Sequence, residues 1–124
     1  MTSTTKLFAI SEQNGVSVIT PHGDALSHRD VDVQREATMV NELLQRENVQ
    51  RLVVDLSEGN YFGSLLIGIL NSFGQTVKKQ GGMMVLAGAS TDMQAIMKVM
   101  KLDTLWPHFP NRNDAVKIAK AWKG

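Results

Sequence analysis

Residues 51–70 place a short apolar run, a loop of turn-forming residues and the start of a helix in direct succession, and no other stretch constrains the fold as much. The run at 52–54, Leu-Val-Val, lacks the alternation of a half-exposed strand and is typical of a parallel strand covered on both faces. The loop that follows carries the turn formers Ser57, Gly59, Asn60 and Gly63. From Ser64 onward the apolar spacing is helical, so this order indicates an α/β fold.

Ser64 stands where this helix is expected to begin. A serine here suits an N-cap, because its hydroxyl can accept a hydrogen bond from a free backbone amide of the first turn. The same position lies at the positive end of the helix dipole, where free amides would also stabilise a phosphate. Local chemistry therefore supports two interpretations of Ser64, a structural cap and a phosphoacceptor, and the cap is the commoner of the two.

Length and composition place this chain among small globular domains. Its 124 residues leave room for one core and one sheet, so we expect a single domain over residues 1–124. A formal net charge of +1 gives no electrostatic reason to expect nucleic acid as a partner. The sequence contains no cysteine, no apolar run long enough to span a bilayer and no signal-like apolar segment at its start. We therefore expect a cytoplasmic protein that does not insert into a membrane.

The remaining elements follow from turn signals and apolar spacing. Strands are expected at 6–12 and 16–22, joined by a tight turn at Asn14-Gly15. A helix should follow from about Val33 and lead back to the strand at 52–54. After the helix from Ser64, the pattern predicts a strand at 83–87, a helix capped by Ser90, a short edge strand within 102–110 and a helix capped by Asn111. The order predicts a mixed, mostly parallel sheet with helices packed on it.

Apolar faces of three helices predict which side chains are buried. On the helix from Ser64 the core-facing stripe is formed by Leu66, Leu70, Phe73 and Val77. Leu65 and Ile69 fall at the edge of this stripe or outside it, so they form either a wide buried face or an exposed docking patch beside Ser64. Core packing is predicted for Met93, Ile96, Met97 and Met100 on the next helix, and for Ala115, Ile118, Ala119 and Trp122 on the last.

The sequence contains no recognisable catalytic signature. His22, His28 and His108 lack the spacing of metal ligands. The sequence around Ser64 lacks the second glycine of a Gly-x-Ser-x-Gly nucleophile elbow, and no P-loop or dinucleotide fingerprint follows a strand. The acidic residues Asp24, Asp30, Asp32 and Asp55 are better explained as solvated or turn residues. We therefore expect no enzyme activity, no metal site and no cofactor.

Five segments together carry a family resemblance. They are residues 20–25 (Thr-Pro-His-Gly-Asp-Ala), 53–57 (Val-Val-Asp-Leu-Ser), 61–64 (Tyr-Phe-Gly-Ser), 81–88 (Gly-Gly-Met-Met-Val-Leu-Ala-Gly) and 102–110 (Leu-Asp-Thr-Leu-Trp-Pro-His-Phe-Pro). In order and spacing the chain resembles a STAS domain of the anti-sigma factor antagonist family over nearly its whole length. The resemblance implies an α/β STAS fold, with a mostly parallel sheet of about four to five strands and four α-helices in the order ββαβαβα(β)α.

The resemblance also implies a function. Antagonists of this family bind a serine-kinase anti-sigma factor and are switched off by phosphorylation of a serine at the position of Ser64. In the family motif an Asp precedes this serine, whereas Gly63 precedes it here, and Leu66 replaces a family glycine. The implied partner is a serine kinase of the histidine-kinase-like ATPase type or a stressosome-like component. A homo-oligomer is also compatible with the resemblance. The implied partner-binding residues are Asp24, Asn60, Gly63, Leu65, Gly68 and Ile69.

Two alternatives accompany this interpretation. The first is a non-catalytic STAS scaffold subunit attached to a transporter complex, without phosphorylation control, whose apolar patch would dock on the complex. The second is a catalytic flavodoxin-like domain, which the absence of catalytic motifs makes the weakest of the three.

Overall fold

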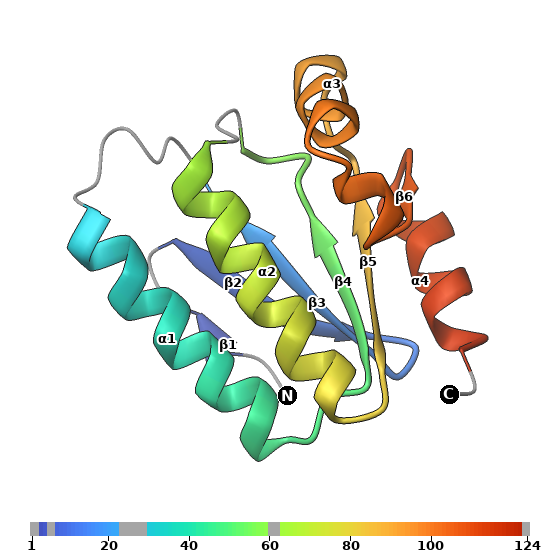
Figure 1. The fold of residues 1–124 in the computed structure, drawn as a ribbon. Helices are drawn as coiled ribbons and strands as arrows, with labels where there is room; N and C mark the ends of the chain where they lie inside the picture. The colour runs from blue at the N-terminus through green and yellow to red at the C-terminus, as the bar shows by residue number, and fades with distance from the viewer. Residues whose placement is uncertain (1–2, 5–6, 23–29, 60–62, 123–124) are drawn as a thin grey trace.

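The computed structural model describes residues 3–4, 7–22, 30–59 and 63–122. These residues form a six-stranded sheet with α-helices on both faces (Figure 1). The strands are β1 (Ser3–Thr4), β2 (Phe8–Gln13), β3 (Val16–Pro21), β4 (Arg51–Asp55), β5 (Met83–Ala87) and β6 (His108–Phe109). The helices are α1 (Asp30–Arg46), α2 (Ser64–Lys79), α3 (Thr91–Val99) and α4 (Arg112–Lys120), with a short 3₁₀ turn at Leu102–Thr104.

The strands lie side by side in sequence order, and the pairing changes direction once. β1, β2 and β3 pair antiparallel, whereas β3, β4, β5 and β6 pair parallel. Asn14 and Gly15 both have positive φ, 55° and 83°, as the predicted tight turn between β2 and β3 requires. The predicted α/β fold with a mostly parallel sheet is confirmed. The two-residue strands β1 and β6 flank the four longer ones, and β1 was not anticipated from the sequence.

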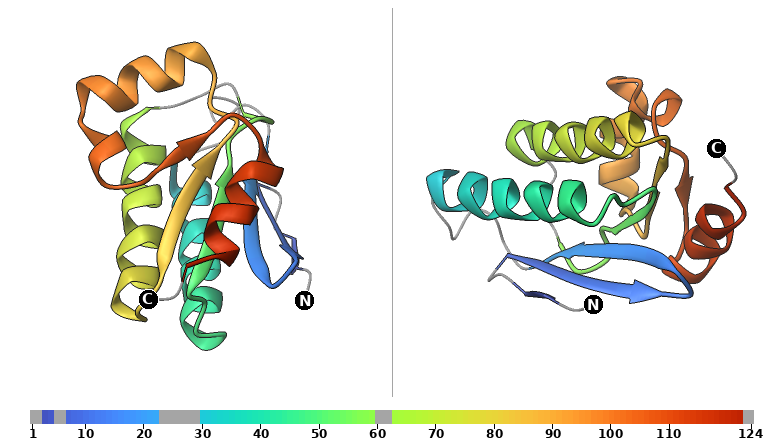
Figure 2. Two further views of the ribbon diagram at one scale, coloured as in Figure 1. Left: turned by 90° about the vertical axis from the view of Figure 1, so that its right-hand side faces the viewer. Right: turned by 90° about the horizontal axis from the view of Figure 1, so that it is seen from below.

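Helices α1 and α2 lie on one face of the sheet and α4 lies on the other (Figure 2). Each face of the sheet packs an apolar core of its own. Leu52 and Val54 of β4 pack in the larger core beneath α1 and α2, and Met93 and Met97 of α3 close its end. Val53 points to the opposite face, where a smaller core packs against α4. Successive side chains of β4 thus enter different cores, which explains why the strand is apolar throughout.

Most of the apolar helix side chains that were predicted to face the core are buried. All four stripe residues of α2 are buried, and Ile69 is buried beside them at 7% exposure, because α1 packs against that flank of α2. Of the two predicted alternatives for Ile69, the buried face is therefore right and the exposed docking patch is wrong. On α3, Met93 and Met97 are buried, but Ile96 and Met100 are 37% and 50% exposed, so their predicted core packing is wrong.

On α4 the buried face is centred on Ala115 and Ala119, as predicted. Val116 completes this face. Ile118 is 43% exposed, so its predicted burial is wrong, because the small alanines bring the other side of the short helix against β4 and β5. Trp122 lies beyond the end of α4 and is half-buried. Ser90 caps α3 by accepting a hydrogen bond from the Met93 amide at 3.1 Å. Asn111 caps α4 in the same way, so both predicted caps are confirmed.

Candidate functional site

The candidate site lies at the edge of the sheet where the parallel strands β3 and β4 end and α2 begins. In open α/β sheets this edge is where ligands and partners bind, since loops and helix N-termini converge there. Gly63, Ser64 and Leu65 reach this edge from the loop after β4. Asp24 and Asn60, which the sequence also assigned to the site, lie outside the described residues.

Ser64 is the first residue of α2 and not its N-cap. The N-cap is Gly63, with φ −108° and ψ −176°, and no side chain among the described residues caps this helix. The predicted cap by Ser64 is therefore wrong, because the helix begins one residue earlier than a serine cap would require. The Ser64 side chain is exposed and makes no hydrogen bond to the described residues. Its hydroxyl is consequently accessible to a modifying enzyme or a partner.

The start of α2 has a positive electrostatic character. Its first amides have no partner within the helix, and a glycine at the N-cap offers no side chain to satisfy them. The first turn contains no acidic residue, while Lys78 and Lys79 occupy the last turn. An anionic group on the Ser64 oxygen would therefore be stabilised by free amides and the helix dipole.

A groove of about 370 Å³ runs from Ser64 between α1 and α2. On the α2 side Leu65 and Gly68 line the groove beyond Ser64, and Leu65 is only half-buried. Ile69 contributes to the floor, so its buried side chain is not an exposed partner contact. The wall from α1 is neutral and polar, formed by Gln34, Thr38 and Asn41 with Ala37.

The two glycines of α2 differ in the space in front of them, and the open one, Gly68, lies in this groove. A Cβ atom at Gly68 would meet nothing within 4 Å, so the position faces open space. A Cβ atom at Gly74, on the same helix, would lie 2.6 Å from Trp106 Nε1. Gly74 is thus required by the packing of Trp106, whereas no described residue requires Gly68. A glycine in an open helical position leaves room for the backbone of another molecule to approach.

An ion pair holds the end of β4 beneath this site. Arg112 Nε of α4 donates to Asp55 Oδ2 at 2.8 Å, and its Nη2 donates to Thr20 Oγ1 of β3 at 3.0 Å. The Ser57 amide donates to the other carboxylate oxygen at 3.0 Å. Burial alone would raise the pKa of Asp55, but the hydrogen bonds from Ser57 and Arg112 and the guanidinium charge outweigh it and lower this pKa. Asp55 therefore anchors the start of the loop that leads to Ser64.

Two histidines lie near the same edge. His22 Nδ1, just after β3, lies 3.3 Å from Glu58 Oε1 in the loop after β4. His108 Nε2 of β6 accepts a hydrogen bond from the Ala89 amide at 3.0 Å, and burial lowers its pKa. Sequence spacing revealed neither role, nor that of Arg112. The one available signal was Asp55, a carboxylate directly after a buried strand, which needs a cationic or amide partner.

Within the described part of the chain, His, Asp and Glu residues form no cluster that could hold a metal ion. Among those same residues, no helix has the length and apolar character to cross a membrane.

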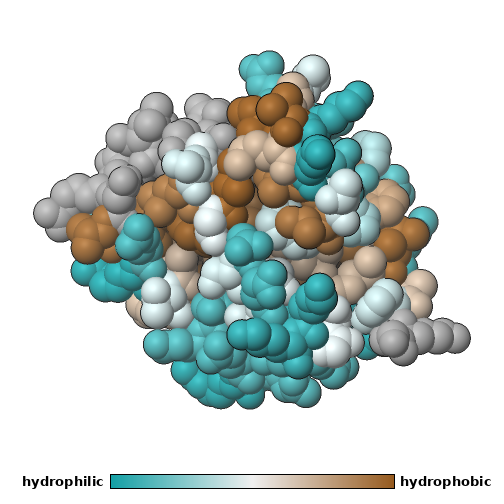
Figure 3. Space-filling view, viewed as in Figure 1, coloured by the Kyte–Doolittle hydropathy of each residue, from teal (hydrophilic) through white to brown (hydrophobic). Residues whose placement is uncertain are grey.

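Exposed apolar side chains gather on α3 and the segment after it, where Figure 3 shows brown atoms at the top of the molecule. This group, the α3 patch, consists of Ile96, Val99, Met100 and Leu105.

The fold and the site define a small α/β domain that presents an exposed serine at the start of its central helix and an open groove beside it. The chain belongs to the STAS domain family, whose model matches residues 8–115. No curated protein sequence matches the chain.

Solved structures of anti-sigma factor antagonists share the fold. A STAS domain protein from Planctomyces limnophilus has a TM-score of 0.76 at 20% identity, over 92% of this chain and 98% of its own. An anti-sigma factor antagonist from Mycobacterium paratuberculosis has a TM-score of 0.75 at 20% identity, over 91% and 92%. The phosphorylated form of the Bacillus cell fate determinant SpoIIAA has a TM-score of 0.62 at 12% identity, over 90% and 97%.

Proposed function

We propose that this chain is a cytoplasmic regulatory domain of the anti-sigma factor antagonist type, which binds a protein partner and catalyses no reaction itself. The partner is a serine kinase of the histidine-kinase-like ATPase type or a stressosome-like component. It docks on the start of α2 and the adjoining groove, a surface that includes Gly63, Ser64, Leu65 and Gly68, and phosphorylation of Ser64 weakens the docking. The observation that carries this proposal is the exposed, uncapped position of Ser64 on that groove.

A phosphate on Ser64 would change the surface without unfolding the domain. It would add nearly two negative charges at pH 7 beside the half-buried Leu65. The free amides and dipole at the start of α2 favour an anion there, so the folded state tolerates the modification. A partner that covers Leu65 would have to desolvate the phosphate, which opposes binding. The proposed switch therefore acts on docking and not on the fold.

The groove supports close docking of a partner. The residues that line it next to Ser64 are uncharged, so an incoming segment meets no fixed charge until Ser64 is modified. Open space in front of Gly68 lets a backbone approach α2 closely. SpoIIAA, which shares this fold, has been solved in a phosphorylated form. This likeness supports the proposal that phosphorylation also controls the present domain.

The test compares four baits in the native host, namely wild type and the variants Ser64→Ala, Ser64→Asp and Thr91→Asp. Thr91 is exposed and is the first residue of α3, as Ser64 is of α2, but it does not line the groove, so Thr91→Asp is the matched charge control. We expect wild type, Ser64→Ala and Thr91→Asp to retain one kinase-type protein, and Ser64→Asp to lose it. Equal affinity of purified partner for Ser64→Ala and Ser64→Asp would refute the proposed switch.

A second candidate function is a scaffold subunit of a transporter complex. The α3 patch favours this function. Its four exposed apolar side chains lie on one segment, and a phosphorylation switch at the start of α2 does not explain their exposure. Under this function a transporter component would bind the α3 patch. Val99→Asp would then abolish binding, and Ser64→Asp would leave it unchanged.

A further inference from the structure

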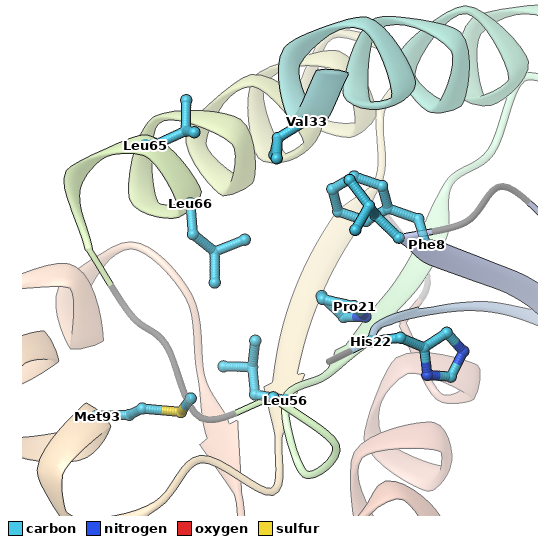
Figure 4. Close-up of a pocket in the computed structure, with 10 residues that line it drawn as sticks. Phe8, Pro21, His22, Val33, Leu56, Leu65, Leu66 and Met93 are labelled. Atoms are coloured by element: carbon cyan, nitrogen blue, oxygen red, sulfur yellow. The ribbon is translucent and has the colours of Figure 1, made fainter. Parts of the chain in front are cut away.

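A small apolar cavity lies beside the start of α2, where the ends of β3 and β4 meet the first turns of α1 and α2 (Figure 4). Its volume is about 40 Å³. Leu56, Leu66 and Val33 point toward the shared space, while the His22 ring is turned away from it. Met93 of α3 and Phe8 of β2 complete the walls. Residues from six different elements or their flanks thus line one hollow.

The lining indicates an apolar occupant. Phe8, Val33, Leu56, Leu66 and Met93 are all buried and carry no hydrogen-bonding group in their side chains. Among the described residues, every buried side-chain nitrogen or oxygen already has a hydrogen-bond partner. The cavity therefore offers no unpaired buried side-chain group that would orient a nucleotide, a sugar or a charged metabolite.

The volume of the cavity limits the size of the group that it can hold. A single water needs about 10–15 Å³ of such space, so the cavity has room for about three groups of that size. This matches the branched end of a leucine, isoleucine or valine side chain. Pockets that hold whole small-molecule ligands are larger, about 300–1,000 Å³.

Leu65 connects this cavity to the proposed docking surface, since it borders both the cavity and the groove that contains Ser64. We propose that the cavity receives one aliphatic anchor side chain of the protein partner. This inference rests on the proposed function and names the chemistry of its partner. Buried anchors in well-packed pockets carry much of the affinity of an interface. Burying such a side chain corresponds to about a ten- to hundredfold gain in affinity.

The test measures whether the full chain binds an isolated aliphatic side chain here. Methyl-labelled protein is titrated with N-acetyl-leucine methylamide, with N-acetyl-glycine methylamide as the control that lacks a side chain. We expect saturable shifts of the Val33, Leu56 and Met93 methyl signals with the leucine probe, with half-saturation at about 10–100 mM, and none with the glycine probe. Absence of saturable shifts would overturn the inference.

Filling the cavity from within should abolish binding of the leucine probe. Val33→Phe does this, and Val33→Leu is the smaller change if the larger variant does not fold. Val40→Leu makes the same change at a buried position of α1 outside the cavity, so it should leave the shifts intact. Persistence of the shifts in a folded Val33 variant would overturn the inference.

A free acyl chain is the competing occupant of the cavity, and octanoate is the probe for it. Binding of octanoate at least tenfold tighter than the leucine probe would overturn the anchor cavity. Failure of the leucine probe, with partner binding still controlled by Ser64, would refute the anchor cavity alone. Leucine binding that survives while Ser64→Asp leaves partner affinity unchanged would support the cavity and refute only the proposed switch.

Discussion

Replacing Gly68 with alanine adds one methyl group to an exposed position of α2 where nothing lies within 4 Å. Glycine in a helix interior costs about 0.8–1.0 kcal/mol relative to alanine. Because no neighbour has to move, the whole gain should appear as a free energy of unfolding about 1 kcal/mol higher. For a domain of this size the melting temperature should rise by about 3–5 °C.

Gly74→Ala is the matched control, since it makes the same change on the same helix. There the new methyl would lie 2.6 Å from Trp106 Nε1 and 3.2 Å from Met84 Cε, and Trp106 is itself buried. Overpacking of this kind costs about 1–3 kcal/mol, which exceeds or cancels the helical gain. Urea denaturation followed by circular dichroism measures both variants with wild type.

The two glycine variants also connect stability to docking. Gly68→Ala should bind the partner several-fold more weakly although it is more stable, because its methyl occupies the groove beside Ser64. A Gly68→Ala protein that is less stable than wild type, or a Gly74→Ala protein as stable as Gly68→Ala, would refute the helix packing described above.

Four further predictions concern the surroundings of the site. Ser90→Ala should lower the free energy of unfolding by about 1 kcal/mol through loss of a cap, whereas Ser64→Ala should change it by less than about 0.5 kcal/mol, as thermal melts of both will show. Arg112→Ala should cost about 2 kcal/mol in urea denaturation by leaving a buried carboxylate unpaired. The pKa of Asp55 in the folded state lies below its ordinary value of 3.8. The stability that the ionised Asp55 contributes is therefore present above pH 3.8 and is lost as the pH falls below that value. Asp55→Asn should flatten the fall in stability at acid pH. Because the pKa of His108 is lowered in the folded state, the unfolded chain binds a proton at this residue more readily. Stability is therefore lost as pH falls below about 6.5. His108→Asn should remove this dependence, as denaturation series at several pH values will show.

The local signals in the sequence were sufficient for most elements. Asn14-Gly15 specified a hairpin turn, and Ser90 and Asn111 specified caps, because each acts through residues only a few positions away. The start of α2 was harder, because Gly63 and Ser64 are both acceptable N-caps and the difference is a single residue.

Features that depend on distant residues could not be predicted. The burial of Ile69 follows from α1 lying against that flank of α2, which helical periodicity alone does not reveal. The pair of Asp55 and Arg112 joins residues 57 positions apart, and its geometry exists only once α4 packs on the sheet. The exposure of Met100 follows from the end of α3 at Val99, beyond which the chain turns away.

Control of docking by Ser64 is tested by the affinity of the partner for the domain before and after phosphorylation of this serine. The purified partner kinase and ATP are incubated with wild type and Ser64→Ala, the phosphorylated residue is located by mass spectrometry, and binding is measured by calorimetry. We expect one phosphate on Ser64, none on the alanine variant, and at least a tenfold loss of affinity in a domain that stays folded. Phosphate on another residue, or unchanged affinity of the Ser64-phosphorylated domain, would contradict this expectation.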